Sequence, residues 1–191
     1  MAGEIGQSIG DKGEKAFADL CNKFDCEFLH ISQEPSQYSS KMYQTRQKRP
    51  DFLVNIPDIT SLFVDVKVRE QKPAGNRSQK LVNIKAFSVD YTDFEKMRRL
   101  ENRIRVSTWY AFFEMKGESD LFRSPAYLVP LSRVEKQLPD HIRKRMAAGN
   151  EVKNWPEIRI PIHCMNEWTR NIDLSDKCQG CTERYCSIDL K

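Results

Sequence analysis

Residues 49–70, RPDFLVNIPDITSLFVDVKVRE, contain two apolar runs separated by a turn-forming Pro-Asp pair. The length of each run and its content of β-branched residues predict two strands joined by a turn. Charged side chains interrupt both runs, at Asp51, Asp65 and Lys67. Because a charge buried without a partner is strongly unfavourable, we expect these three side chains to be paired with one another or with a cation.

The positions of these charges within the strands predict where their side chains point. Side chains alternate between the two faces of a strand, so Asp65 and Lys67 share a face that the intervening valine does not. If the two strands are neighbours, Asp51 converges with Asp65 and Lys67 on one side of the sheet. A hard divalent cation such as Mg²⁺ would neutralise the carboxylates, polarise a phosphodiester and activate a bound water, while Lys67 stabilised the developing charge. The pattern therefore indicates metal-assisted phosphodiester hydrolysis.

The remaining apolar patterns predict helices and strands on both sides of this pair. A chain of 191 residues with 39% apolar residues has enough material for one core. A capping-box spacing of Thr92 and Glu95 predicts the start of the second helix. The expected helices cover 12–24, about 92–105, and 132–148 with a break at Pro139 and a stop at Gly149; the expected strands cover 26–31, 51–56, 62–69, 106–115, 126–131 and 157–164. This order predicts an α/β or α+β fold with a mixed sheet flanked by helices.

Pro50-Asp51, a spacer and then Asp65-Val66-Lys67 resemble the motif of the PD-(D/E)xK nuclease superfamily. The resemblance extends to Glu14 in GDKGEKAF, on the first predicted helix, and to the polar, serine-containing arm SQYSSKMYQTRQKR that precedes the motif. These features are similar to the Holliday-junction-resolvase-like or restriction-endonuclease-like branch, over about residues 10–131. The resemblance implies a restriction-endonuclease-like core, which we expect to occupy residues 1–150, and an Mg²⁺-dependent DNA endonuclease.

Carried over position by position, the resemblance assigns roles to five residues. Asp51 and Asp65 would be ligands of Mg²⁺ or Mn²⁺, and Val66 would add its backbone carbonyl as a ligand. Lys67 would be the catalytic lysine, and Glu14 an additional acid at or near the metal.

Each of these assignments has a simpler alternative. Asp51 and Asp65 could face solvent on a one-sided sheet with Lys67 as a surface salt-bridge partner. Glu14 could close a capping box with Asp11, three residues before it. The whole scaffold could also serve as a DNA-binding or assembly module without catalysis.

The basic residues are unevenly distributed, although the formal net charge is only +4. Lysines and arginines on both sides of the motif are expected to neutralise DNA phosphates, because counterion release then strengthens binding. No base-reading motif is present, so DNA structure or DNA ends are the expected targets, and RNA remains an alternative. A two-fold homodimer would suit a nuclease that cuts both strands. The expected phosphate contacts are Lys41, Arg46, Lys48, Arg49, Arg69, Lys72 and Arg77.

The C-terminal segment, residues 151–191, is rich in cysteine and is expected to form a small extension. Its thiols are Cys164, Cys178, Cys181 and Cys186. Two thiolates separated by Gln-Gly can grip one ion from a tight turn, and four would complete a tetrahedral structural Zn²⁺ site. The alternative is a 4Fe–4S cluster, as in exonucleases of the same superfamily, with Cys21 or Cys26 joining the last three cysteines.

No apolar run is long enough for a membrane span, and the N-terminal residues lack the apolar segment of a secretory signal. We therefore expect a cytoplasmic protein whose clustered cysteines bind metal rather than form disulfides.

Overall fold

The computed structural model describes residues 2–31, 49–56, 60–73, 84–115, 126–150 and 157–168, with the backbone alone for residues 2–8. The elements in chain order are α1 (Ala2–Lys23), β1 (Glu27–His30), β2 (Phe52–Ile56), β3 (Thr60–Arg69), β4 (Lys72–Pro73), β5 (Lys85–Asp90), α3 (Tyr91–Ile104), β6 (Thr108–Glu114), β7 (Tyr127–Pro130), α4 (Leu131–Glu135), α5 (Asp140–Ala147), β8 (Glu157–Pro161), a 3-10 turn (Ile162–Cys164) and β9 (Asn166–Glu167).

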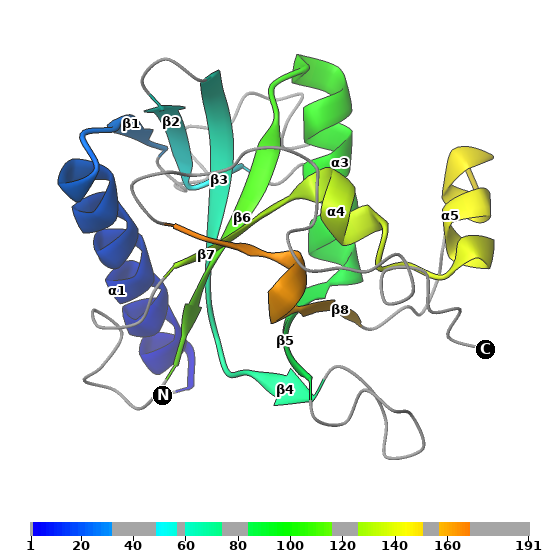
Figure 1. Cartoon of the computed structure of the whole chain (residues 1–191), viewed down its shortest axis with the longest axis horizontal. Coiled ribbons are helices and arrows are strands. Elements are labelled where there is room, and N and C mark those ends of the chain that lie inside the picture. The colour runs from blue at the N-terminus through cyan, green and yellow to red at the C-terminus, as the bar shows by residue number, and fades with distance from the viewer. Residues whose placement is uncertain are drawn as a thin grey trace.

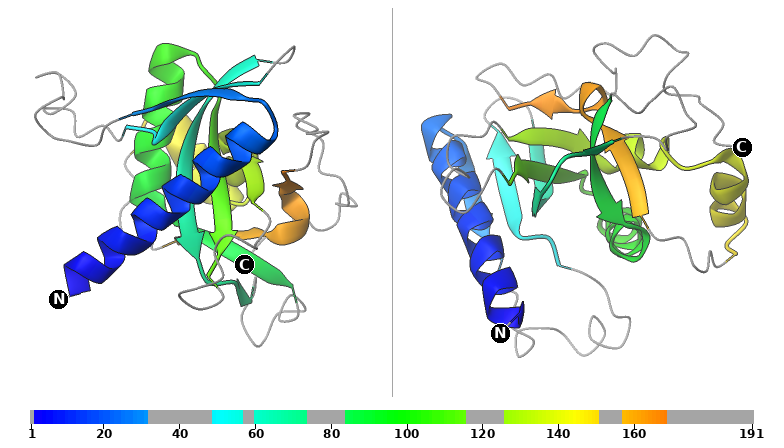
Figure 2. Two further views of the ribbon diagram at one scale, coloured as in Figure 1. Left: turned by 90° about the vertical axis from the view of Figure 1, so that its left-hand side faces the viewer. Right: turned by 90° about the horizontal axis from the view of Figure 1, so that it is seen from below.

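A six-stranded sheet runs through the middle of the molecule, in the order β1-β2-β3-β6-β7-β9. β3 and β6 are parallel, whereas each other neighbouring pair in this sheet is antiparallel. A smaller antiparallel sheet has the order β4-β5-β8. α1 lies along one face of the large sheet, and α3 and α4 lie on the other (Figures 1 and 2). The expectation of a mixed sheet flanked by helices is confirmed.

Each face of the large sheet covers a separate apolar cluster, because side chains alternate along β3 and β6. On the α1 side the cluster includes Phe17, Phe52, Val64, Trp109 and Trp168. On the α3 side it includes Phe87, Phe94, Met97, Tyr110 and Phe112. β3 and β6 therefore lie between two buried layers, which fixes which face each of their side chains occupies.

The starts of two helices differ from expectation. α1 begins at Ala2 rather than at residue 12, so Asp11 lies inside the helix. α3 begins at Tyr91 with Asp90 as its N-cap residue, and the Asp90 side chain makes no capping hydrogen bond. Thr92 is therefore already helical and does not cap the helix, which corrects the capping-box prediction.

The expected interruption near residue 139 is confirmed. α4 ends at Glu135 and α5 begins at Asp140, with Pro139 as its N-cap residue. Gly149 has a φ of 73° and donates its N–H to the Met146 carbonyl, so a residue that tolerates a left-handed backbone ends the helix.

Residues 157–168 pack against the rest of the protein. β8 pairs with β5, β9 pairs with β7, and Trp168 lies 5.0 Å from Phe17 between ring centroids. Residues 157–168, which belong to the predicted C-terminal extension, therefore share the sheets and the apolar clusters of the core. In the described part of the chain, no helix has the length and apolar character needed to cross a membrane.

Candidate active site

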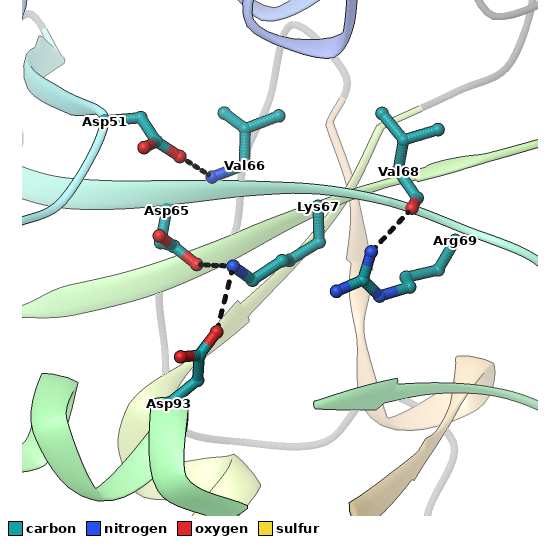
Figure 3. A network of polar contacts seen from close by, with 7 residues as sticks. All are labelled: Asp51, Asp65, Val66, Lys67, Val68, Arg69 and Asp93. Carbon is teal, nitrogen blue, oxygen red and sulfur yellow. Dashed lines mark hydrogen bonds and ion pairs between the residues drawn. The ribbon is translucent and has the colours of Figure 1, made fainter. Parts of the chain in front are cut away.

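A lysine lies between two carboxylates where β3 passes the start of α3 (Figure 3). The Nζ atom of Lys67 is 2.8 Å from Oδ2 of Asp65 and 3.3 Å from Oδ2 of Asp93. The side chain of Asp65 is fully buried, and that of Lys67 is only 12% exposed. Such charges interact strongly in a low-dielectric interior, and the pairing offsets the cost of removing each of them from water.

The positions of these side chains follow from the sheet register. Asp65 lies opposite Tyr110 and Lys67 lies opposite Phe112 in the parallel β3–β6 pair. Tyr110 and Phe112 belong to the apolar cluster on the α3 side, so Asp65 and Lys67 point to that side as well. α3 follows β5 without a loop, which places Asp93 in the first turn of α3.

Asp51 is bound to the β3 backbone. Its Oδ2 atom accepts a 2.7 Å hydrogen bond from the backbone N–H of Val66, the residue between Asp65 and Lys67. Its own N–H donates to the Val64 carbonyl at 2.9 Å, although the β2–β3 register pairs Val64 with Phe52. The ladder is therefore irregular at Asp51, and a carboxylate oxygen accepts the hydrogen bond of a strand N–H.

This irregularity changes the predicted geometry. In Figure 3 the Asp51 carboxylate lies on the side of β3 to which Val66 points, whereas Asp65 and Lys67 extend to the other side. β2 begins only at Phe52, so the strand alternation used in the prediction does not extend to Asp51. The structure brings Asp51 and Asp65 to the same segment of β3 but does not direct their carboxylates to one side of it.

Glu14 lies on α1 and contacts β1. Its Oε2 atom is 2.7 Å from Nε2 of His30, whose ring lies 4.9 Å from that of Phe52. Asp11 is in the interior of α1, so the alternative of a capping box between Asp11 and Glu14 is wrong. Glu14 is thus on the α1 side of the sheet, as Asp51 is, and both are separated by β3 from the Asp65–Lys67 pair.

Tyr110 and Asp93 were not predicted as site residues. The hydroxyl of Tyr110 is buried and has no hydrogen-bond partner within the described residues. Burial raises the pKa of Tyr110 well above its usual value, and the carboxylates of Asp65, Asp93 and Asp90 add to this effect. Tyr110 could have been found from its strand pattern, but its neighbours, and the pairing of Asp93 with Lys67, depend on tertiary structure.

Three of the expected phosphate contacts lie in the described part of the chain. Arg49 is partly buried immediately before Pro50 and Asp51. Arg69 donates from Nη1 to the Val68 carbonyl at 3.2 Å, and Lys72 lies 3.6 Å from Glu157. The others, Lys41, Arg46, Lys48 and Arg77, lie outside the described residues.

The three cysteines that the structure describes lie on opposite sides of the large sheet. Cys164 is fully buried in the apolar cluster on the α3 side, whereas Cys21 and Cys26 are buried on the α1 side. Burial, with a contribution from the neighbouring Cys26, raises the pKa of Cys21 to about 12. The remaining predicted zinc ligands, Cys178, Cys181 and Cys186, lie outside the described residues. Residues 157–168 thus give no support to a zinc-stapled extension.

The donor chemistry near Asp65 can be compared with the needs of Mg²⁺. Carboxylates and a backbone carbonyl are oxygen ligands that suit Mg²⁺; Asp65 and Val66 carry them on β3, and Asp51 carries one just before β2, hydrogen-bonded to Val66. Among the residues that the structure describes, no group of three or more histidine, cysteine, aspartate or glutamate side chains is arranged to hold a metal ion. A magnesium ion held through one or two of these carboxylates would complete its coordination with backbone oxygens, water or substrate.

The comparison with solved structures gives a distant likeness. No family model matches the chain, and no curated protein matches it either. The structure is similar to that of Hjc, a Holliday junction resolvase from the archaeal hyperthermophile Archaeoglobus fulgidus, with 10% sequence identity and a TM-score of 0.47 over 80% of this chain and 88% of the resolvase chain. A likeness this distant carries no argument about function.

Proposed function

We propose that the chain is an Mg²⁺-dependent DNA endonuclease that hydrolyses phosphodiester bonds in structured or duplex DNA. One observation carries the proposal: a buried carboxylate and a lysine are paired at residues 65 and 67 of β3, and a second acid is hydrogen-bonded to the residue between them. Asp65 pairs with Lys67 at 2.8 Å, and Asp51 accepts the Val66 N–H at 2.7 Å. Structural charges are seldom gathered at the centre of a buried parallel strand pair, because each must be removed from water.

The residues divide the work of the proposed reaction. Asp65 would hold the metal ion with the Val66 carbonyl. Asp51 would join them once its carboxylate leaves the Val66 N–H and turns to the Asp65 side of β3. When bound, the ion would polarise the phosphodiester and lower the pKa of a water molecule. Lys67 would place a positive charge where negative charge develops on the phosphate. Glu14 is proposed as an additional acid, acting from the α1 side.

One observation favours a second function, a non-catalytic DNA-binding or assembly module. Asp51 already has a structural role, because it accepts the Val66 N–H on the opposite side of β3 from the Asp65 carboxylate. A shared ion would require the Asp51 and Asp65 oxygens to meet. The module needs no such meeting, and its DNA contacts would come from the basic residues alone.

The two functions are separated by a cleavage assay on the full chain. Labelled four-way junction, duplex and single-stranded DNA would be incubated with Mg²⁺ or with EDTA. Asp65→Asn removes the buried negative charge but keeps the side-chain shape. Asp19→Asn is the matched control, since Asp19 is 54% exposed and pairs with Lys15 on α1.

An endonuclease requires internal cleavage that depends on Mg²⁺, is lost in Asp65→Asn and persists in Asp19→Asn, with DNA binding retained in both. Binding without cleavage by the unaltered chain would favour the module. Cleavage only from DNA ends by a brown, iron-containing protein would instead point to the iron–sulfur exonuclease alternative.

The zinc-binding extension is a separate proposal, supported by the Cys-Gln-Gly-Cys spacing. Its four ligands would be Cys164, Cys178, Cys181 and Cys186. Its job would be structural, because four protein ligands leave no open position for chemistry.

A further inference from the structure

The ammonium of Lys67 has two acidic neighbours from different elements, Asp65 on β3 itself and Asp93 on α3. Figure 3 shows the Lys67 side chain extending from β3 toward α3, with its nitrogen between the two carboxylates. We propose that Asp93 is a positioning residue for the nuclease reaction, which holds the Lys67 ammonium in place while Asp65 serves the metal ion. This inference rests on the proposed function, because it assigns Lys67 to catalysis.

A bound metal ion would compete with Lys67 for the Asp65 carboxylate. A carboxylate that binds a divalent cation gives up part of its interaction with a neighbouring ammonium, and the two cations then repel each other. If Asp65 were the sole partner of Lys67, metal binding would release the long lysine side chain. Asp93 supplies a second negative charge 3.3 Å from the same nitrogen, and it does so from α3 rather than from β3.

The surroundings make this contact strong. The Lys67 side chain is 12% exposed and that of Asp93 is 25% exposed, so water screens their attraction only partly. The buried Tyr110 ring lies across from Asp65 on the same face and forms an apolar wall. A carboxylate in the first turn of α3 also interacts favourably with the helix dipole.

Asp93 therefore acts on the reaction through Lys67, and the experiment must distinguish this from metal binding. We would measure kcat and KM for cleavage, and Mn²⁺ affinity by calorimetry, for Asp93→Asn, Asp93→Glu and Asp65→Asn. Asp90→Asn is the matched control, because it removes the same charge from the start of the same helix at an exposed position.

In Asp93→Asn, kcat is expected to fall by roughly 10-fold to 100-fold, the effect of a slightly misplaced catalytic group, with KM for DNA nearly unchanged. Asp93→Glu should recover part of the loss, and Asp90→Asn should lose less than about 2-fold. Mn²⁺ affinity should weaken in Asp65→Asn but remain unchanged in Asp93→Asn. An unchanged kcat in Asp93→Asn, or an Mn²⁺ affinity weakened as much as in Asp65→Asn, would overturn the inference.

A second measurement tests the contact between Asp93 and Lys67 without relying on DNA cleavage. The free energies of urea unfolding of Asp93→Asn, Lys67→Met and the double variant form a double-mutant cycle, which reports whether residues 67 and 93 interact. If Asp93 holds Lys67, the double variant is less destabilised than the sum of the single variants. Additive losses would show that the contact does not hold Lys67, whether or not the chain cuts DNA. A coupled pair in a protein without cleavage would instead contradict the nuclease.

Discussion

Gly13 of α1 packs directly on Val68 of β3: a methyl group added at Gly13 would overlap the Cγ2 atom of Val68 and would also touch Val66. The helix can therefore approach this strand only because residue 13 has no side chain. β3 also carries Asp65 and Lys67 on its other face, so the close contact fixes the strand on which the candidate site is built.

Gly13→Ala is expected to destabilise the protein by about 1–3 kcal/mol, the usual cost of overfilling a packed interface. Val68 is 8% exposed and lies between two buried layers, so it has little room to move. Urea unfolding followed by circular dichroism measures the change.

Gly10→Ala is the matched control for that prediction. Gly10 lies in the same helix, and a methyl group there would meet nothing within 4 Å. Alanine should then stabilise the helix by about 0.5–1 kcal/mol. If both alanine variants stabilise the protein, α1 does not approach β3 as closely as the structure shows.

The alternation of side chains along a strand correctly predicted the shared face of Asp65 and Lys67, but it did not predict where the Asp51 side chain points. The period-2 pattern of LFVDVKVR correctly indicates that Asp65 and Lys67 share a face, because both lie inside a regular strand. Asp51 lies just before β2, where the ladder is irregular, and no local pattern marks that irregularity. A prediction from alternation thus holds only as far as the ladder does.

The elements that the sequence did not predict depend on partners distant in the chain. β5 is six residues long and pairs with β8, about seventy residues later. Asp93 likewise becomes a site residue because the β5–α3 junction places it beside Lys67. Neither the β5–β8 pairing nor the Asp93–Lys67 contact leaves a periodic signal in the sequence. The sequence around Asp93 would form the same helix if the Asp93 side chain were exposed.

Asp51 should affect stability through the hydrogen bond to Val66. Asp51→Ala leaves the backbone N–H of Val66 without this acceptor, and a partly buried N–H that loses its partner costs about 1–3 kcal/mol. Asp51→Asn keeps an oxygen acceptor and should lose less than Asp51→Ala. Equal unfolding free energies for the alanine variant and the unaltered chain would show that this hydrogen bond contributes nothing to stability.

The raised pKa of Tyr110 predicts that the folded protein loses stability at alkaline pH. Its pKa in the folded protein is raised well above its usual value of 10.0, mainly by burial. In the unfolded chain the hydroxyl ionises near its usual pKa, so above that pH the unfolded state binds fewer protons and folding weakens as pH rises. Tyr110→Phe removes this ionisation, and its free energy of unfolding should therefore fall less steeply above about pH 10 than that of the unaltered chain.

The measurement is urea unfolding at several pH values, with the tyrosinate absorbance recorded in parallel. Tyr91→Phe serves for comparison, because burial also raises the pKa of Tyr91 but its neighbours include the cations Arg98 and Arg99, which act in the opposite direction. The Tyr110 variant should show the larger gain at alkaline pH. Parallel pH profiles for Tyr110→Phe and the unaltered chain would contradict the prediction.

Metal content tests the cysteine-rich end. The purified full chain is expected to be colourless and to contain one zinc ion per chain, which Cys178→Ala should remove. Cys164→Ala distinguishes a zinc site that includes Cys164 from one that does not. The question arises because the Cys164 thiol is fully buried among apolar side chains. Zinc that persists in Cys164→Ala would exclude Cys164 as a ligand, and visible absorbance with bound iron would replace the zinc proposal by a cluster.

DNA binding should depend on salt through the basic residues beside β3. Arg69 is the last residue of β3, and Lys72 lies in β4, so both follow the Asp65–Lys67 segment closely. Each phosphate contact contributes about 0.7–0.9 to the slope of log K against log salt, because it releases condensed counterions. Arg69→Gln and Lys72→Gln should each make the slope less negative by about that amount, and together by about twice that amount.

Lys15→Gln is the matched control. Lys15 is exposed on α1, where it pairs with Asp19, so this substitution should leave the slope unchanged. A slope that none of these substitutions alters would place the DNA elsewhere on the protein, away from the strand that carries Asp65 and Lys67.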